Sequence, residues 1–314
     1  MTRASTMSGV TQSQPVALPA PILVRTRRGL AAARPALPAP VVLVPTMGAL
    51  HDGHRSPLRV AREHAGPDGS VLVSIFVNPL QFGPAEDFDR YPRPMARDLA
   101  FCAQEGVTAV FNPSIAQMYR TQSMVTVNPG PMGLLLEGAS RPGFFDGVLT
   151  VVLKLFQLTR PDAAVFGAKD AQQLALISRM VLDLDLGVQV IGAPLHRDPD
   201  GLAASSRNAY LSAAERASAL SLSRALEAAR AAAPAGAGPA VSAARAVLNR
   251  AAATSPPVSL DYLVLADPDS FEEVSADHAG PAILLVAAKI GGTRLIDNLP
   301  VDVGHFAARP GRLS

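Results

Sequence analysis

Short apolar stretches alternate with amphipathic ones along the first two thirds of the chain. The apolar stretches are rich in β-branched residues and predict strands at 41–44, 71–77, 109–111, 163–166 and 188–191. The stretches between them predict helices at 26–34, 50–64, 94–104, 146–158 and 171–182. This alternation predicts an α/β fold, a Rossmann-like, doubly wound parallel sheet that binds its ligand at the carboxyl ends of the strands.

The pattern changes after the last of these strands. Ser212 and Glu215 have the spacing of a capping box and open a long Ala-rich helix. The run AAAPAGAGPA at 231–240 is predicted to be a flexible connection. Three further strands are predicted at 258–265, 282–290 and 293–299. These elements predict a smaller C-terminal α+β domain.

We divide the chain into three parts on this basis. Residues 1–20 are rich in Ser, Thr, Gln and Pro without any period and are predicted to be a disordered leader. Residues 21–193 are expected to form the Rossmann-like domain. A boundary near Pro194 separates it from the smaller domain at 194–314.

The composition limits the classes of function. A net charge of +2 without blocks of like charge argues against nucleic acid as a partner. Charged residues interrupt the apolar runs well before the roughly 18–20 residues of a membrane span, and the N-terminus lacks a signal-peptide pattern. Cys102 is the only cysteine, so no internal disulfide forms, which fits a reducing compartment. We expect a cytoplasmic protein with no membrane partner.

A histidine pair follows the first predicted strand. His51 and His54 lie in the run PTMGALHDGH, and if a helix starts at Leu50 both imidazoles share one face of its first turn. Free backbone N–H groups there favour an anion such as a phosphate. The pair alone leaves phosphate binding open against metal ligation or a structural role. Because zinc needs a third ligand and neither Cys102 nor the other histidines have ligand spacing, we predict no metal site.

Two further segments carry groups that suit phosphate, although neither standard phosphate loop is present. In VFGAKD, Gly167 permits close backbone approach and Lys169 brings positive charge to a helix start. The alternative is a surface lysine in a loop.

In DGLAASSRN, the side chains of Ser205, Ser206 and Arg207 offer two hydroxyls and a planar cation. The alternative is a Ser-rich turn that caps a helix.

Amide side chains follow other predicted strands. Such groups can hold a small polar substrate in a mostly apolar pocket, although amides on a helix face are often only solvated. The candidate amides are Asn78, Gln81, Gln172 and Gln173, and the candidate apolar lining is Met47, Phe76 and Phe82.

Together these segments resemble the pantothenate synthetase family of adenylate-forming nucleotidyltransferases, which shares its HxGH and Lys/Ser signatures with class I aminoacyl-tRNA synthetases. The matching segments are PTMGALHDGH, VSIFVNPLQFGPAEDFDRYPR, LEGASRPGFFDGVLTVVLKLF, PDAAVFGAKDAQQL, RDPDGLAASSRNAYLS and GGTRLIDN. The resemblance implies ATP-dependent condensation of pantoate with β-alanine through a pantoyl adenylate, releasing pyrophosphate and AMP. It also implies Mg²⁺ with the ATP, a homodimer, and a lid function for 194–314.

The resemblance assigns roles to particular residues. The catalytic residues, which would contact or close over the ATP phosphates, are His51, His54, Lys169, Ser205, Ser206 and Arg207. The residues expected along the nucleotide are Met47, Gly167 and Asp170, together with His54, Lys169, Ser205, Ser206 and Arg207 from the catalytic set. The residues expected to hold pantoate are Thr46, Met47, Asn78, Gln81, Phe82 and Gln173.

Five positions depart from the family pattern. The family has Glu, His, Glu or Gln, often Tyr, and Met where this chain has Asp52, Phe144, Ala168, Ala171 and Ala204. We expect affinity for ATP or β-alanine to be weakened by the changes at Phe144 and Ala204. Two alternatives follow: another nucleotidyltransferase of the same fold, or an ATP-binding homologue with weakened catalysis.

Overall fold

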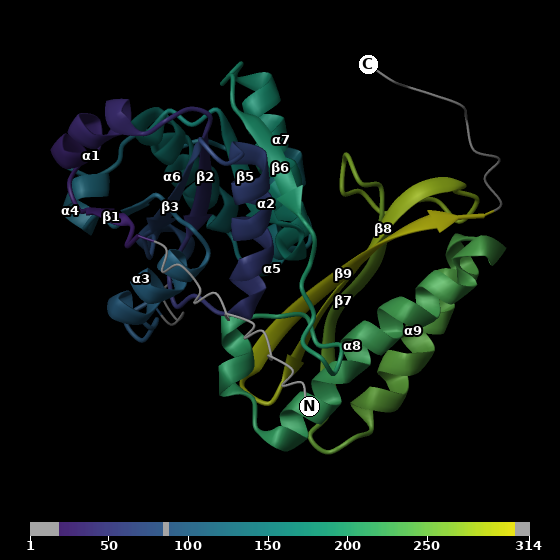
Figure 1. Cartoon of the computed structure of the whole chain (residues 1–314). Coiled ribbons are helices and arrows are strands. Elements are labelled where there is room, and N and C mark those ends of the chain that lie inside the picture. The colour runs from purple at the N-terminus through teal and green to yellow at the C-terminus, as the bar shows by residue number, and fades with distance from the viewer. Residues whose placement is uncertain (1–18, 84–87, 305–314) are drawn as a thin grey trace, which may run out of the picture.

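The computed structural model describes residues 19–83 and 88–304. All but the last two residues of the leader predicted at 1–20 lie outside the described residues. The described residues build two sheets with helices packed against them, and Figure 1 shows these as two units side by side.

The first sheet has six parallel strands in the order β1-β4-β3-β2-β5-β6. The strands are β1 (Ile22–Val24), β2 (Val41–Thr46), β3 (Ser70–Ile75), β4 (Ala109–Phe111), β5 (Ala163–Gly167) and β6 (Gln189–Ala193). The predicted doubly wound α/β fold is confirmed, and β1 is an edge strand that the sequence pattern did not predict. The strand order reverses direction between β2 and β5, where ligands bind in such sheets.

Helices cover both faces of this sheet. They are α1 (Arg27–Ala33), α2 (Arg55–Ala65), α3 (Met95–Gln104), α4 (Ile115–Met118), α6 (Phe144–Thr159) and α7 (Ala171–Asp183). The short helix α5 (Glu137–Ser140) instead contacts the second sheet. Because side chains alternate along a strand, Leu43 of β2 packs in one core with α1, α6 and α7, while Val42 and Val44 pack in another with α2 and α3. Short 3₁₀ turns are η1 (Arg34–Ala36), η2 (Asp52–His54), η3 (Pro79–Gln81), η4 (Pro131–Leu134) and η5 (Ala168–Asp170).

The helix expected from Leu50 begins later than predicted. Gly48 and Ala49 have φ angles of +81° and +52°, so the chain turns sharply after β2. The turn η2 follows, and α2 starts only at Arg55. Pro57 therefore falls in the first turn of α2, where its missing N–H leaves no hydrogen bond unmade.

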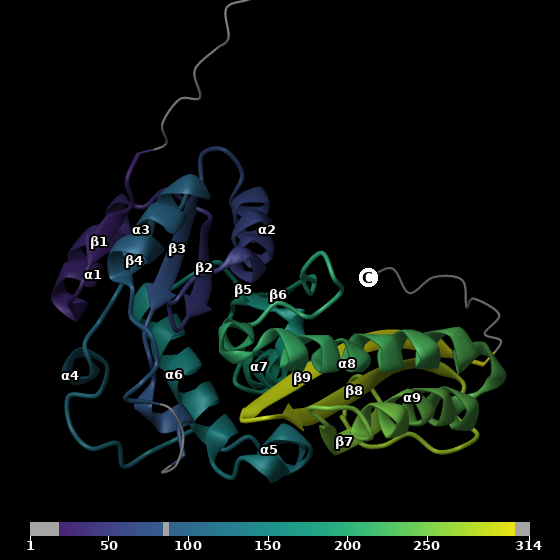
Figure 2. The same cartoon turned by 90° about the horizontal axis from the view of Figure 1, so that it is seen from below.

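The second sheet is antiparallel, with β7 (Val258–Ala266), β8 (Gly280–Ile290) and β9 (Thr293–Val303) in sequential order. The helices α8 (Ala213–Ala232) and α9 (Ala237–Ala252) pack on it, as Figure 2 shows. The predicted capping box is confirmed: Ser212 Oγ accepts from the Glu215 N–H, and the Glu215 carboxylate accepts from the Ser212 N–H. The turn η6 (Ser206–Tyr210) precedes α8.

The prediction of a flexible connection at 231–240 was wrong. The segment is a tight corner made of the end of α8, the turn η7 (Ala233–Ala235) and the start of α9. Ala233, Ala237 and Ala240 are buried there, because side chains this small let the two helices approach closely. The same small residues hid α9 from the sequence pattern, since Ala and Gly resemble a linker in composition.

Among the helices of the described ranges, none has both the length and the apolar character needed to cross a membrane.

Candidate active site

A cavity of about 300 Å³ opens at the carboxyl ends of β2 and β5. All the candidate residues named from the sequence line it except Asn78 and Gln172. The lining includes Thr46, Met47, His51, His54, Phe76, Gln81, Phe82, Gly167, Lys169, Asp170, Gln173, Ser205, Ser206 and Arg207. They come from segments far apart in the chain, and the parallel sheet brings them to one edge. We call this cavity the cleft.

The two histidines hold each other in place. The Gly53 N–H donates to His51 Nδ1 at 3.1 Å, and the His51 N–H donates to His54 Nδ1 at 3.2 Å. The rings meet edge to face with centroids 4.3 Å apart. Because each Nδ1 accepts a backbone N–H, the proton of each neutral ring is on Nε2. Both residues therefore offer an Nε2–H donor.

Both imidazoles are neutral at neutral pH. Burial, followed by the neighbouring His51, lowers the pKa of His54 to about 3. Burial also lowers the pKa of His51, although Asp198 opposes the shift. A neutral imidazole can donate a hydrogen bond to a phosphate oxygen, but the positive charge at the cleft has to come from elsewhere.

Asp98 holds the turn that carries the histidines. Its carboxylate, on α3 and only 1% exposed, accepts the N–H of Ala49 at 3.0 Å and of Leu50 at 2.8 Å. These bonds satisfy two buried backbone donors of a turn with positive φ angles. Sequence analysis missed Asp98, and the only available signal was an acidic residue in the first turn of an amphipathic helix.

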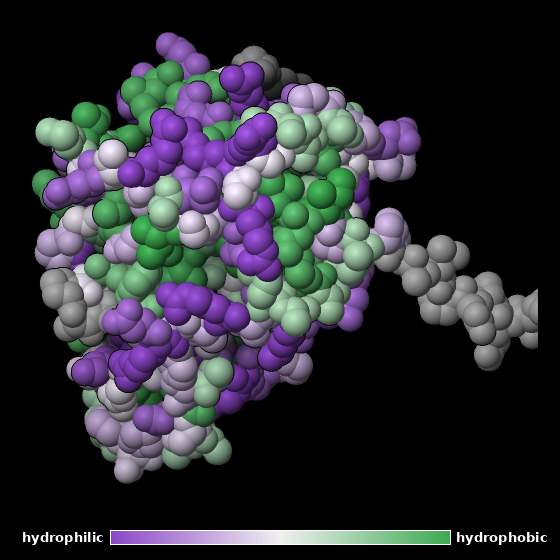
Figure 3. Space-filling view, turned by 90° about the vertical axis from the view of Figure 1, so that its left-hand side faces the viewer, coloured by the Kyte–Doolittle hydropathy of each residue, from purple (hydrophilic) through white to green (hydrophobic). Residues whose placement is uncertain are grey.

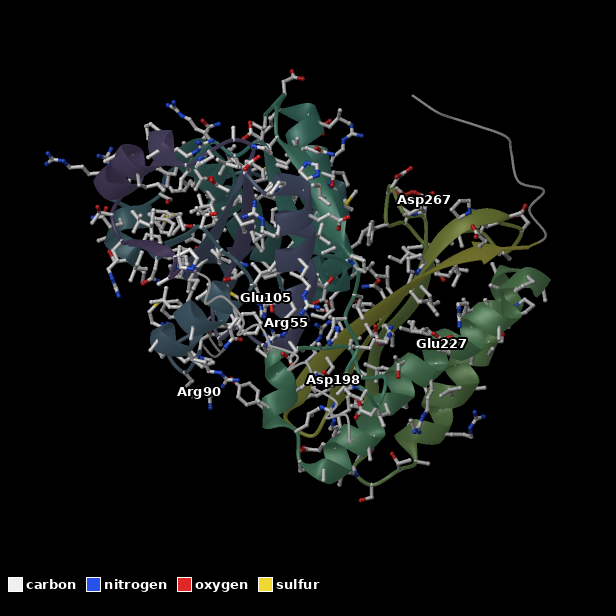
Figure 4. All side chains as sticks on the ribbon, viewed as in Figure 1. Arg55, Arg90, Glu105, Asp198, Glu227 and Asp267 are labelled. Atoms are coloured by element: carbon white, nitrogen blue, oxygen red, sulfur yellow. The ribbon has the colours of Figure 1, made fainter. Side chains whose placement is uncertain are left out.

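Arg55 anchors the start of α2 just after the histidines. It pairs with Glu105 at the end of α3 and with Asp52 at 2.9 Å, and its guanidinium lies 4.7 Å from the centre of the Phe101 ring. Figure 4 shows Arg55 and Glu105 side by side. The helices that flank the histidine turn are thus joined to each other.

Lys169 lies on η5, between β5 and α7, as the sequence predicted. Its ammonium pairs with the carboxylate of Asp170 at 2.9 Å and lines the cleft. The turn itself is held from the second sheet, because Asn298 Nδ2 on β9 donates to the carbonyl oxygens of Ala168 at 3.0 Å and Lys169 at 2.7 Å. Asn298 is 5% exposed. It belongs to the GGTRLIDN segment, but sequence analysis gave it no role.

The Ser-Arg segment is also fixed by β9. Arg197 makes a two-pronged pair with Asp297, at 2.7 and 3.0 Å, and a β-bridge joins Arg197 to Ala203. This places Ser205 at the edge of the cleft, where its hydroxyl accepts the Arg207 N–H at 3.3 Å and caps η6. The capping role and a place in the cleft therefore coexist.

A third group of contacts joins β9 to α5. Arg294 donates to both carboxylate oxygens of Glu137, at 2.8 and 2.7 Å, and Tyr262 donates to the same carboxylate at 2.8 Å. Arg294 also pairs with Asp261 at 2.7 Å. Figure 2 shows α5 against the end of the antiparallel sheet. These contacts, which sequence analysis missed, hold the two sheets together beside the cleft.

The amides divide into two groups. Gln81 and Gln173 line the cleft, whereas Asn78 lies behind its wall and donates to Gln81 Oε1 at 2.9 Å. Gln172 is 3% exposed and serves the fold, because its Nε2 donates to the carbonyls of Met132 and Leu135. Successive side chains on a helix point in directions about 100° apart, so of two adjacent glutamines on α7 only one faces the cleft.

The remaining wall of the cleft is apolar, and two departures from the family pattern lie at its edges. Its apolar members include Met47, Phe76, Phe82, Val148, Val151, Val152, Leu155 and Phe166. The ring of Phe144 is stacked under the Arg141 guanidinium, 3.8 Å from ring centre to carbon. Ala204 is buried against the Gly53 backbone, where a longer side chain would need other space.

These features define a class of protein. A parallel sheet with a reversal in strand order, N–H donors and a lysine in the turns that leave β2 and β5, and a Ser-Arg loop that lines the same cleft are typical of a nucleotide-binding α/β protein. The chain belongs to the pantoate-beta-alanine ligase family, whose model matches residues 23–300.

Known proteins agree with this assignment. A pantothenate synthetase of Thermobifida fusca is 58% identical over 300 residues, covering 94% of this chain and 100% of the relative. The crystal structure of pantothenate synthetase from Thermus thermophilus superposes with a TM-score of 0.81 at 43% identity, covering 88% of this chain and 98% of the other. A Francisella tularensis pantoate-beta-alanine ligase, complexed with beta-gamma ATP and beta-alanine, gives a TM-score of 0.71 at 32% identity, with 89% and 97% covered.

The low pKa of His54 predicts an acid-sensitive fold. In the unfolded chain His54 takes up a proton near its ordinary pKa of 6.5, whereas in the folded chain it does so only near 3. Protonation thus favours unfolding, and the free energy of unfolding should fall as the pH drops from 6.5 towards 3.

Urea unfolding at about pH 7.5 and about pH 5 measures this effect. His54→Gln, which cannot titrate, should lose less stability between the two pH values than the unchanged protein, and His64→Gln on the exposed side of α2 is the control. An equal loss in the His54→Gln variant would contradict the assignment of this acid sensitivity to His54.

Proposed function

We propose that the chain joins pantoate to β-alanine at the expense of ATP, through a pantoyl adenylate, and releases pyrophosphate and AMP. The observation that supports this most directly is that the His51–His54 pair, Lys169 and the Ser205–Arg207 loop line one cleft in a member of the ligase family. The Francisella relative, complexed with beta-gamma ATP and beta-alanine, binds the corresponding kinds of ligand.

In the first step, a carboxylate oxygen of pantoate attacks the α-phosphorus of ATP. The bond from that phosphorus to the bridging oxygen breaks, and pyrophosphate leaves with the electron pair. Negative charge shifts towards the leaving oxygens, where the Nε2–H donors of His51 and His54 and the ammonium of Lys169 stabilise it. Ser205, Ser206 and Arg207 close over the triphosphate. The chain thus acts by positioning groups and fixed charge.

In the second step, the neutral amine of β-alanine attacks the acyl carbon of the adenylate. AMP leaves with the electron pair of the cleaved bond, and the amine loses a proton as the amide forms. Through both steps Gln81, Gln173 and Thr46 hold the polar groups of pantoate, while Met47 and Phe82 face its methyl groups. Gly167 and Asp170 lie along the nucleotide.

We further propose how the chain is divided between these tasks. Residues 21–193 bind nucleotide and pantoate, and 194–314 act as a lid that lines the cleft with the Ser205–Arg207 loop and holds the Lys169 turn through Asn298. Magnesium would arrive with ATP, since Mg²⁺ is usually held by substrate phosphates and few carboxylates. Within the described ranges, no three His, Cys, Asp or Glu residues group to hold a metal.

We also propose a cytoplasmic homodimer. Cys102 is free and buried, as suits a reducing compartment. Met124 and Val125, after α4, are 95% and 85% exposed, and Ile22 of the edge strand β1 is 53% exposed. Figure 3 shows apolar side chains among polar ones on the side of the molecule that carries α1 and α4. Exposed apolar residues of this kind support a contact between two copies. The mass in solution, by light scattering, should be that of two chains.

Lys169→Ala is expected to fold normally and to form adenylate at least about a hundredfold more slowly, because removing one preorganised group that stabilises developing charge costs this much. His54→Ala should behave alike. The measurement is pyrophosphate release with ATP, magnesium, D-pantoate and β-alanine, each omitted in turn. Lys289→Ala, on the exposed side of β8, is the matched control. Near-normal rates in the Lys169 or His54 variant would remove the assignment for that residue.

Asn298→Ala is expected to lower kcat for pyrophosphate release by about tenfold or more, because two hydrogen bonds that hold the Lys169 turn are lost. The KM for pantoate should change little, since Asn298 does not line the cleft. Asn249→Ala on the exposed face of α9 is the control. A normal kcat for Asn298→Ala would show that the turn keeps its place without β9.

A further inference from the structure

Tyr119 lies behind the cleft, at the end of α4, and has no role in the chemistry described so far. Its hydroxyl donates to Asn78 Oδ1 at 2.7 Å. Its ring lies 6.2 Å from that of Phe76, centre to centre, and the ammonium of Lys154 lies 5.3 Å from its centre. Burial raises the pKa of the phenol, so the hydroxyl keeps its proton and can act as a donor.

Backbone groups fix which way the Asn78 carboxamide points. Its Oδ1 accepts the Leu80 N–H at 3.3 Å, and its Nδ2 donates to the Gly147 carbonyl at 3.1 Å. Since a backbone N–H only donates and a carbonyl only accepts, the amide cannot be reversed without losing both bonds. The bond from Tyr119 is the shortest of those to Oδ1 and acts in the same direction.

The orientation of Asn78 decides that of Gln81. Asn78 Nδ2 also donates to Gln81 Oε1 at 2.9 Å, so the acceptor end of the Gln81 carboxamide is turned into the protein. Its donor end, Nε2, has no acceptor among the described residues, and Gln81 lines the cleft. The hydrogen bonds from Tyr119 to Asn78 to Gln81 all run in one direction, and each strengthens the next.

We propose that Tyr119 and Asn78 are positioning residues that make Gln81 a donor towards the substrate. The inference rests on the proposed function, which places a hydroxy acid against Gln81. The carboxylate and hydroxyl oxygens of such a substrate accept hydrogen bonds from Nε2–H, whereas a reversed Gln81 would present an oxygen to a carboxylate and repel it. The three residues thus select a substrate that is rich in acceptors.

Tyr119→Phe removes only the hydroxyl at the start of this series. It should raise the KM for pantoate in pyrophosphate release by about three- to tenfold, the effect of one net hydrogen bond. The KM for ATP should stay within about twofold of its value in the unchanged protein, whereas a general loss of structure would change the KM for both substrates. Tyr210→Phe is the matched control, because Tyr210 is exposed, does not line the cleft and makes no hydrogen bond to Asn78.

A double-mutant cycle tests whether the effect passes through Gln81. In a Gln81→Ala background, Tyr119→Phe should leave the KM for pantoate unchanged. Asn78→Asp is a second, independent variant of nearly the same shape: its carboxylate can only accept, so Gln81 must turn its Nε2 inwards. The KM for pantoate should then rise more than in Tyr119→Phe, again with the KM for ATP unchanged.

The outcomes separate this proposal from the proposed function. If the unchanged protein releases no pyrophosphate with pantoate, both are overturned. If the unchanged protein is active, three results overturn the positioning role alone. Tyr119→Phe could leave the KM for pantoate unchanged, or raise the KM values for pantoate and ATP by the same factor. It could also raise the KM for pantoate as much in the Gln81→Ala background as in the unchanged protein. If Tyr119→Phe does not fold, Asn78→Asp decides, and an unchanged KM for pantoate in that variant overturns the role.

Discussion

The arrangement of the cleft depends on the carboxamide of Asn298, which donates to the carbonyl oxygens of Ala168 and Lys169. Strand β5 ends at Gly167 and α7 begins at Ala171, so only the short turn η5 connects them at the mouth of the cleft. A buried carbonyl without a donor costs free energy of about 1–3 kcal/mol. Strand β9 supplies the donor, and the position of Lys169 therefore depends on the docking of the second sheet.

Neighbouring residues of β9 extend the same dependence to the rest of the site. Asp297 pairs with Arg197, just before the Ser-Arg loop, and Arg294 pairs with Glu137 at the start of α5. Both carboxylates are largely buried, and a buried charge is tolerated only with a partner and hydrogen bonds. One strand of the smaller sheet thus fixes three segments around the cleft, and the contact between the two units supports the cleft.

Local patterns in the sequence were enough to predict the elements that carry the chemistry. His51 and Lys169 follow buried strands, and the rule that parallel strands share a carboxyl edge brings them together. Asp98 and Asn298 could not be found in this way, because their backbone partners lie 48 and 129 residues away and no local period marks them. The corner at 231–240 was predicted wrongly because its local composition resembles that of a linker. Packing between α8 and α9, which the local pattern does not show, makes it helical.

Three side chains of the cleft that can both donate and accept hydrogen bonds give their acceptor ends to the protein. His51 and His54 accept backbone N–H groups at Nδ1, and Gln81 accepts from Asn78 at Oε1, so all three keep their Nε2–H for the ligand. Lys169 and Arg207 have only donors. ATP and a hydroxy acid present mainly oxygen acceptors, which suit these donors. The pair contributes without a charge on His54, because burial keeps that imidazole neutral, and the cationic side chains that line the cleft include Lys169, Arg207 and Arg141.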